Sequence, residues 1–196
     1  MKSGSAWEGD ADAVLRLMKS RRVCRSFTDE TVSDEDLSKI TEAARWATSA
    51  GNRHIHKFLV VRDKDAIRQV RSVAPGMLGV PPALILILTD ECEAQRQSVQ
   101  LSVDPANLMD VGTSAMNMMN MVHALGLGSC PVTSFSQSGV VVMLDLPKHL
   151  RPEWILMIGH PAPTMRQMRT GAPKPISAHE LTYWESVGDH EPKKAE

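Results

Sequence analysis

Neither sign of charge dominates this sequence, and aromatic residues are scarce. Of its 196 residues, 22 are Lys or Arg and 23 are Asp or Glu, which gives a formal net charge of −1. A balanced charge removes the electrostatic argument for binding nucleic acid or an anionic membrane surface. Aromatic residues make up only 4% of the chain, whereas it has twelve methionines, which we interpret as adaptable fillers of a core.

Long hydrophobic runs and cysteine pairs are also missing. The longest apolar run, Pro81 to Leu88, is far too short to cross a bilayer. The opening residues, MKSGSAWEGDADAV, are partly acidic and contain no apolar stretch of signal-peptide length. Cys24, Cys92 and Cys130 are far apart and form no C-x-x-C pair, so neither a disulfide framework nor a zinc knuckle is indicated. We therefore expect a soluble, cytoplasmic protein whose length suits one domain.

The common catalytic motifs of hydrolases and nucleotide-cleaving enzymes do not occur. The sequence has no G-x-S-x-G elbow, no P-loop and no H-E-x-x-H pair. Of its seven histidines only His54 and His56 are close together, and a metal site needs a third ligand. We predict no metal site, and no side-chain nucleophile is evident.

Helix and strand patterns alternate along the chain. Apolar spacing predicts helices around 14–19, 37–47, 65–73, 105–125 and 140–144, and apolar runs predict strands at 58–61, 83–89, 130–135 and 154–159. Segment 91–103 fits neither pattern. Ser33, three residues before Asp36, resembles the start of a capping box ahead of the second helix. The alternation indicates an α/β or α+β sandwich around one sheet.

The predicted helix at 105–125 is the longest. Asp104 and Pro105 are expected as its N-cap and its first residue. Its main apolar stripe consists of Leu108, Val111, Ala115, Met118, Val122 and Leu125. Three further methionines lie off that stripe, at Met116, Met119 and Met121. We therefore expect this helix to be buried completely, or partly by a second subunit.

Two stretches are candidates for binding a ligand. The segment KSRRVCRSF, residues 19–27, is either a solvated charge run or a grip on a phosphate, because guanidinium groups match phosphate oxygens bidentately. The segment HALGLGSC, residues 123–130, closes a helix with glycines that permit a flat ring to approach the backbone. It does not match the dinucleotide motif G-x-G-x-x-G, because it opens no helix.

Read together and in order, five motifs closely resemble the FMN-dependent nitroreductase family. They are RRVCRSF, EAARWATSAGN, FLVV, DVGTSAMNMMNMVHALGLGS and ILMIGHP, and the likeness runs from about Val14 to Tyr183. The resemblance implies an α+β sandwich with a central mixed or antiparallel sheet flanked by helices. It also implies an arm-exchanging homodimer with FMN at each side of the interface. The expected organisation is a flexible N-terminus (1–10), a single FMN-binding domain (11–188) with a C-terminal arm from about 161, and a flexible tail (189–196).

The resemblance also suggests which residues bind the cofactor. Arg21, Arg22 and Arg25, with Val23 where the family often has serine, match the segment that holds the FMN phosphate and ribityl chain. Ser49 and Asn52 match a loop that contacts the flavin, and Thr133, Ser134 and Phe135 match the backbone near flavin N5. Lys174, or failing that Arg169, matches a basic residue that completes the phosphate site.

One departure concerns the two histidines. His54-Ile55-His56 replaces the family's common Gln-Pro-Trp, in a stretch close to the flavin. The histidines either shape a substrate pocket, contact the cofactor or pack, and proton transfer is a further possibility. No catalytic side chain is assigned, since flavin N5 carries the chemistry in this family.

The resemblance implies NAD(P)H-driven reduction of a nitroaromatic, quinone or related conjugated substrate by ping-pong hydride transfer. VAPGMLGVP, GLGSCPVTSF and YWESVG further resemble the flavin subunit of cyclodipeptide oxidases, which works with a small second subunit and uses oxygen as acceptor. A third hypothesis is a non-catalytic FMN-binding subunit.

Overall fold

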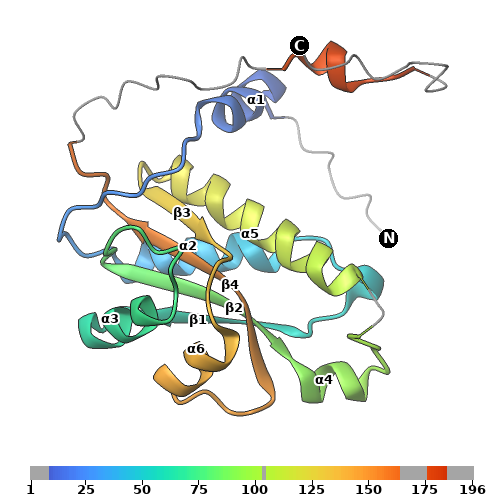
Figure 1. The fold of residues 1–196 in the computed structure, drawn as a ribbon. Coiled ribbons are helices and arrows are strands. Elements are labelled where there is room, and N and C mark those ends of the chain that lie inside the picture. Colours follow the sequence, from blue (N-terminus) through green and yellow to red (C-terminus); the bar gives the residue numbers. More distant parts are fainter. Residues whose placement is uncertain (1–8, 103–104, 164–175, 185–196) are drawn as a thin grey trace, which may run out of the picture. The chain divides into compact units, whose positions relative to one another are not determined.

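A four-stranded sheet organises the computed structural model of the chain, which describes residues 9–102, 105–163 and 176–184 (Figure 1). The strands are β1 (His56–Val61), β2 (Ala83–Asp90), β3 (Gly128–Val132) and β4 (Leu150–Gly159), in the order β1-β2-β4-β3. All three pairings are antiparallel. Of the mixed and antiparallel sheets that the resemblance implied, the antiparallel one is found, and an isolated bridge between Val23 and Ser129 is parallel.

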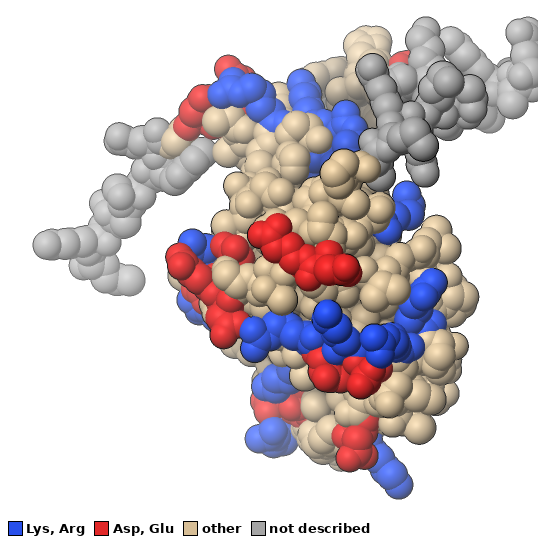
Figure 2. All heavy atoms as spheres, turned by 90° about the vertical axis from the view of Figure 1, so that its left-hand side faces the viewer, with Lys and Arg blue, Asp and Glu red and all other residues tan. Residues whose placement is uncertain are grey.

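Helices cover both faces of the sheet (Figure 1). They are α2 (Asp34–Arg45) and α5 (Ala106–Ala124) on one face, and α3 (Lys64–Ser72) and α6 (Gln137–Met143) on the other. On the face of the molecule in Figure 2, basic and acidic side chains are intermixed, in line with the balanced net charge. Ion pairs in the described part of the chain include Arg62 with Asp34 and Lys39 with Glu35. None of the helices in the described part of the chain is long and apolar enough to span a membrane.

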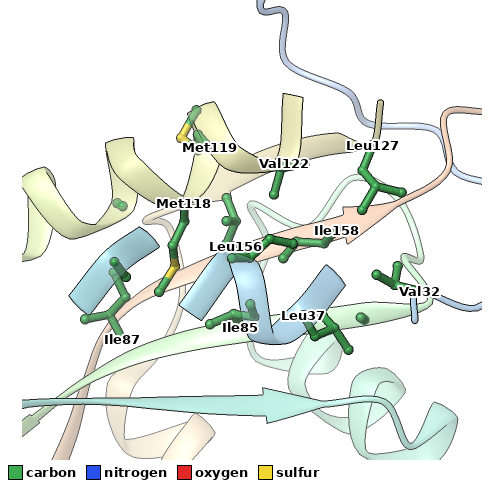
Figure 3. Close-up of a cluster of buried hydrophobic side chains, with 14 of the residues drawn as sticks. Val32, Leu37, Ile85, Ile87, Met118, Met119, Val122, Leu127, Leu156 and Ile158 are labelled. Atoms are coloured by element: carbon green, nitrogen blue, oxygen red, sulfur yellow. The ribbon is translucent and has the colours of Figure 1, made fainter. Parts of the chain in front are cut away.

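Two hydrophobic clusters, one on each face, explain why β2 is apolar from Ala83 to Leu88. Ile85 and Ile87 point toward α2 and α5 (Figure 3), whereas Leu84 and Leu86 point toward α3 and α6. Every residue of β2 is buried. A strand covered on both faces needs apolar residues at consecutive positions. The prediction of a strand at 83–89 is confirmed.

The remaining elements are short. They are α1 (Ala11–Ser20), α4 (Glu91–Arg96) and the 3-10 turns η1 (Ala50–Asn52) and η2 (Ala178–Leu181). The predicted cap at Ser33 is confirmed, because its side chain accepts a hydrogen bond from Asp36 N at 3.0 Å. Helix α4 fills part of the segment that the patterns left undecided. The turn η2 lies in a separate unit, residues 165–196, of which 176–184 are described.

The start of α5 differs from the prediction. Pro105 occupies the N-cap position instead of the first helical position, and no side chain caps the helix there; Asp104 lies outside the described residues. Leu108, expected in the buried stripe, is 64% exposed. The first turns face Asn107 and Asp110 inward, where they hydrogen-bond to His56 and to Ala50 N. Satisfying these polar groups rotates Leu108 outward.

The third strand is also displaced from its predicted range of 130–135. It begins at Gly128 and ends at Val132. The chain then leaves the sheet, because Ser134 O accepts a hydrogen bond from Gly76 N at 3.0 Å and Ser136 N donates to Val73 O at 2.8 Å. These two bonds tie Ser134 and Ser136 to the turn after α3 instead of to β4.

Candidate functional site

The cationic segment that contains Arg21, Arg22, Val23 and Arg25 lies along the outer edge of β3. Cys24 N donates to Ser129 O at 2.8 Å, beside the bridge between Val23 and Ser129. Further along, Thr28 N donates to His160 O at 2.9 Å, which fixes the other end of the segment.

Gly79 packs closely against the backbone of the same segment. A Cβ atom placed on Gly79 would lie 2.2 Å from the carbonyl oxygen of Arg25, so only glycine permits this backbone contact. Arg25 itself is exposed. In the described part of the chain, Arg21, Arg22 and Arg25 form no ion pair with a carboxylate. The segment therefore presents three guanidinium groups that no acidic side chain neutralises.

Thr133, Ser134 and Phe135 follow β3 directly, at the same side of the sheet as the cationic segment. Thr133 and Ser134 are exposed, while Phe135 packs partly against the hydrophobic cluster under α3 and α6. The structure thus places these two predicted groups on one edge strand. The two candidates for the remaining cation, Arg169 and Lys174, lie outside the described residues.

Ser49, Asn52, His54 and His56 lie before and at the start of β1, the other edge strand. A cavity of about 350 Å³ borders this loop. Its lining includes Ser49, His54, His56, Arg45, Lys57 and Asp110. Both histidines line the cavity, with the buried Ile55 between them. Among the described residues, no group of three His, Cys, Asp or Glu side chains is placed to hold a metal ion.

Two polar side chains of α5, Asp110 and Thr113, hold this loop in place, and a third, Asn117, ties α5 to α2. The Asp110 carboxylate accepts a hydrogen bond from Ala50 N, with its two oxygens at 3.1 and 3.2 Å. Thr113 Oγ1 donates to Thr48 O, and Asn117 Nδ2 donates to Ala43 O, each at 3.1 Å. The resemblance to the family singled out none of these three. Their spacing of three and four residues puts them on one helix face, and that polar stripe in an apolar helix was the available signal.

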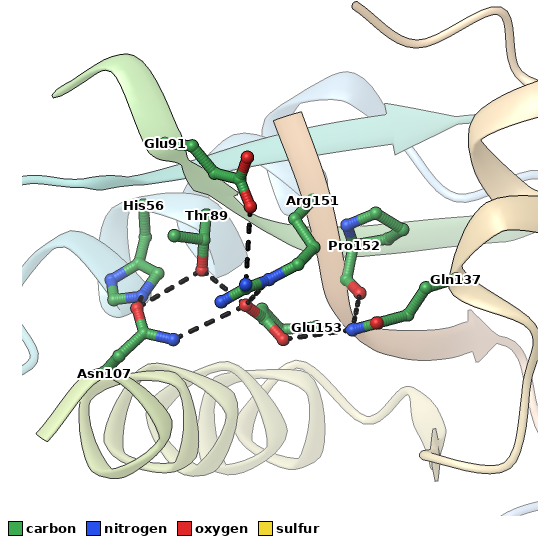
Figure 4. Close-up of polar contacts among 8 residues, drawn as sticks. All are labelled: His56, Thr89, Glu91, Asn107, Gln137, Arg151, Pro152 and Glu153. Atoms are coloured by element: carbon green, nitrogen blue, oxygen red, sulfur yellow. Dashed lines mark hydrogen bonds and ion pairs between the residues drawn. The ribbon is translucent and has the colours of Figure 1, made fainter. Parts of the chain in front are cut away.

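His56 is connected to a buried polar network (Figure 4). Its Nε2 lies 3.0 Å from Asn107 Oδ1. Burial lowers the pKa of His56 below its usual 6.5, and this outweighs the opposing effects of the Asn107 hydrogen bond and of the Asp110 and Glu153 charges. The ring is therefore neutral around pH 7, in contrast to a freely titrating surface histidine.

The predicted residues thus form two groups on opposite edge strands, β3 and β1. Three inter-strand steps of about 4.8 Å separate these strands, or about 14 Å. One group offers cations and the other offers a cavity lined by polar side chains. Among the described residues, the lining of the cavity beside β1 includes no residue of the cationic segment.

Comparison with known proteins agrees with this architecture. The sequence model described as "Nitroreductase family" matches residues 18–78 and 73–160. The chain is 25% identical over 185 residues to "FMN reductase [NAD(P)H]" of Bacillus subtilis, covering 87% of this chain and 74% of that protein. It is 26% identical over 155 residues to a "Putative NADH dehydrogenase/NAD(P)H nitroreductase" of Methanothermobacter thermautotrophicus, covering 76% and 78%.

Solved structures show the same fold. NfrA1 of B. megaterium superposes with a TM-score of 0.74 at 21% identity, covering 91% of this chain and 76% of that one. A nitroreductase family protein of Clostridium difficile superposes with a TM-score of 0.72 at 24% identity, covering 88% and 98%. Since the family match extends over most of the sheet and of the helices that cover it, the chain belongs to the nitroreductase family.

Proposed function

We propose that this chain is an FMN-dependent oxidoreductase that uses NAD(P)H to reduce a nitroaromatic, quinone or related conjugated substrate in two half-reactions. The observation that carries the proposal is the family match across residues 18–160. Relatives named as NAD(P)H-dependent FMN reductases and nitroreductases support it. The same proposal accommodates the absence of a nucleophile motif, because the cofactor supplies the reactive atom.

The residues of the cationic segment suit the anionic end of FMN. Arg21, Arg22 and Arg25 are not neutralised by carboxylates in the described part of the chain, and Gly79 lets the backbone at Arg25 pack closely. A phosphate dianion favours several converging guanidinium donors. Lys174 or Arg169, outside the described residues, would add one more cation.

The remaining predicted contacts have distinct roles in this proposal. When bound, FMN supplies the atom, N5, that accepts and donates hydride. Ser49 and Asn52 would contact the flavin, and the backbone at Thr133–Phe135 would lie beside its reactive edge. His54 and His56 would form the wall of a substrate pocket, which fits their place in the cavity beside β1.

A second copy of the chain would complete each site. Leu108, Met109 and Met116 on α5 are 64%, 65% and 46% exposed, and a Cβ on Gly112 would meet nothing within 4 Å. An apolar surface of this kind on a helix calls for a partner. We propose a homodimer packed on α5, in which one subunit contributes the cationic segment and the other the loop at Ser49 and Asn52. Met109→Glu should shift the protein toward monomer in analytical ultracentrifugation, whereas an unchanged dimer would place the interface elsewhere.

The first experiment is an anaerobic absorbance trace of the purified protein with FMN, adding NADPH and then NADH. Loss of the flavin band within seconds is the expected result. A band that persists with both nicotinamides, but bleaches with a cyclic dipeptide, would replace the proposal by an oxidase that passes electrons to oxygen. A band that neither nicotinamides nor substrates bleach would indicate a non-catalytic FMN-binding subunit.

Cofactor retention tests the cationic segment separately. Arg25→Ala removes a charge-assisted hydrogen-bond donor, so FMN affinity should fall at least about tenfold. Arg16→Ala is the matched control, because Arg16 is an exposed arginine of α1 that pairs with Asp10. Full FMN occupancy of the Arg25 variant after dialysis would contradict the placement of the phosphate.

A further inference from the structure

Four polar side chains from three elements form a network that reaches His56 through Asn107 (Figure 4). Thr89 of β2 is 0% exposed, Asn107 of α5 is 4% exposed and the Glu153 side chain of β4 is 5% exposed, with Arg151 beside them. Burying a carboxylate and an amide is costly unless each polar atom has a partner. The donors and acceptors of this network therefore constrain one another.

Glu153 determines the orientation of the Asn107 side-chain amide. Glu153 Oε1 accepts from Thr89 Oγ1 at 2.8 Å, from Arg151 Nε at 2.8 Å and from Asn107 Nδ2 at 3.4 Å. An ionised carboxylate beside a guanidinium group only accepts hydrogen bonds. The NH₂ group of Asn107 must therefore face Glu153, and its carbonyl oxygen must face the other way.

Asn107 in turn determines the tautomer of His56. The carbonyl oxygen Oδ1 lies 3.0 Å from His56 Nε2 and can only accept, so Nε2 carries the hydrogen. Burial favours the neutral ring, against the pull of Asp110 and Glu153. In a neutral imidazole with a proton on Nε2, Nδ1 is an unprotonated acceptor.

The acceptor is available to the cavity. His56 lines the cavity of about 350 Å³, and its Nε2 is occupied by Asn107, so Nδ1 is the nitrogen that remains for a bound molecule. The other charged or titratable side chains that face this space are Asp110 from α5, Arg45 from α2, and Arg53, His54 and Lys57 around the start of β1. Nδ1 of His56 is thus one of the hydrogen-bond acceptors in the lining of the cavity, alongside the Asp110 carboxylate.

We propose that Glu153 and Asn107 are positioning residues that lock His56 with its proton on Nε2, so that Nδ1 accepts a hydrogen bond from an N–H or O–H group of the substrate. The use of this acceptor in substrate selection rests on the proposed function, whereas the assignment of the tautomer does not. Substrates with an amide or hydroxyl donor at this point are favoured over molecules of the same shape without it, because only the former gain a hydrogen bond to Nδ1.

The tautomer is tested on the full chain without added FMN, by ¹⁵N NMR of labelled histidine side chains. His56, assigned by its loss in His56→Gln, should show a protonated-type shift at Nε2 and an unprotonated-type shift at Nδ1. In Asn107→Leu the two shifts should move toward each other as the tautomers mix. Asn117→Leu is the matched control, the same substitution on the same helix, and should leave the His56 shifts unchanged.

Two results would overturn the tautomer assignment. One is a proton on Nδ1 in the unsubstituted chain, which decides the question even where Asn107→Leu does not fold. The other is an Asn107→Leu spectrum identical to that of the unsubstituted chain. Neither measurement depends on FMN binding, so failure of the proposed function and failure of this assignment are distinguishable.

Selectivity is tested with the FMN-loaded protein and two nitroaromatic probes, 4-nitrobenzamide and its N,N-dimethyl amide. The unsubstituted enzyme should prefer the amide with N–H donors. His56→Phe removes the acceptor and should reduce that preference in kcat/KM by about tenfold, the value of one hydrogen bond. Asn107→Leu leaves the acceptor in the fraction of molecules with the proton on Nε2, so it should reduce the preference by only about twofold. The control Asn117→Leu should keep the preference. A preference in His56→Phe equal to that of the unsubstituted enzyme would overturn the role of His56 as the acceptor for a substrate donor.

Discussion

Asp110 provides a quantitative test of how α5 supports the predicted flavin contacts. Its side chain is 8% exposed and accepts the Ala50 N–H through both oxygens, at 3.1 and 3.2 Å. Ala50 lies between Ser49 and Asn52, in a turn where Gly51 and Asn52 have φ values of 62° and 53°. Gly and Asn adopt left-handed backbone more readily than other residues, and the hydrogen bond to Asp110 holds the turn from outside it. Asp110→Ala removes this bond.

The magnitude follows from that single bond. Both oxygen distances belong to one N–H group, so we count one hydrogen bond to a charged acceptor, worth about 1.5–3 kcal/mol. If this energy holds the loop in its FMN-binding conformation, Asp110→Ala raises the Kd for FMN by about 10- to 150-fold. For a chain of this length the same loss lowers Tm by about 3–12 °C. Asp110→Asn keeps an uncharged acceptor and should give an intermediate result.

Fluorescence quenching of FMN gives the Kd, and a thermal melt gives Tm. Val111→Ala is the control for general destabilisation. Val111 follows Asp110 on α5 and is buried in the hydrophobic cluster. The control substitution should lower Tm and leave the Kd unchanged. An Asp110→Ala protein that binds FMN as tightly as the unsubstituted chain would refute the role assigned to the loop.

Two further predictions concern stability. Since burial lowers the pKa of His56 in the folded chain below 6.5, the unfolded chain binds the proton first as pH falls, and the free energy of unfolding should decrease between about pH 7.5 and pH 5.5. Urea denaturation of His56→Gln should show a shallower pH dependence, and parallel curves would contradict the assignment. Gly79→Ala should destabilise the chain by about 1–3 kcal/mol, because its Cβ would meet Arg25 O. Gly112→Ala, compared in the Met109→Glu background because Gly112 lies on the proposed dimer surface, should stabilise the single chain by up to about 1 kcal/mol. The opposite order in thermal melts would show that these two environments are misassigned.

Local patterns predicted the core elements well. The apolar run of β2 and the helical spacing of α2 are read from neighbouring residues, and both elements occur where they were predicted. The end of β3 could not be predicted in the same way. It depends on hydrogen bonds between Ser134 or Ser136 and the turn at 73–76, some sixty residues away, which no local pattern records.

The candidate site was predictable only in part, for the same reason. The cluster of Arg21, Arg22 and Arg25 is visible because arginines are adjacent in the chain. Asn107 and Asp110 were overlooked because their importance comes from His56 and Ala50, which the fold brings to them from more than fifty residues away. The sequence pattern predicted a buried apolar stripe through Leu108. In the structure Asn107 and Asp110 face inward and Leu108 is exposed.

The placement of the two predicted groups on opposite edge strands has a consequence for mixtures of variants. In the proposed dimer, each site takes its cationic segment from one subunit and its Asp110-held loop from the other. A dimer of one Arg25→Ala chain and one Asp110→Ala chain then has one site with both defects and one site with neither. Two preparations that each fail to retain FMN should therefore complement one another when their subunits exchange, and random pairing of equal amounts restores about a quarter of all sites.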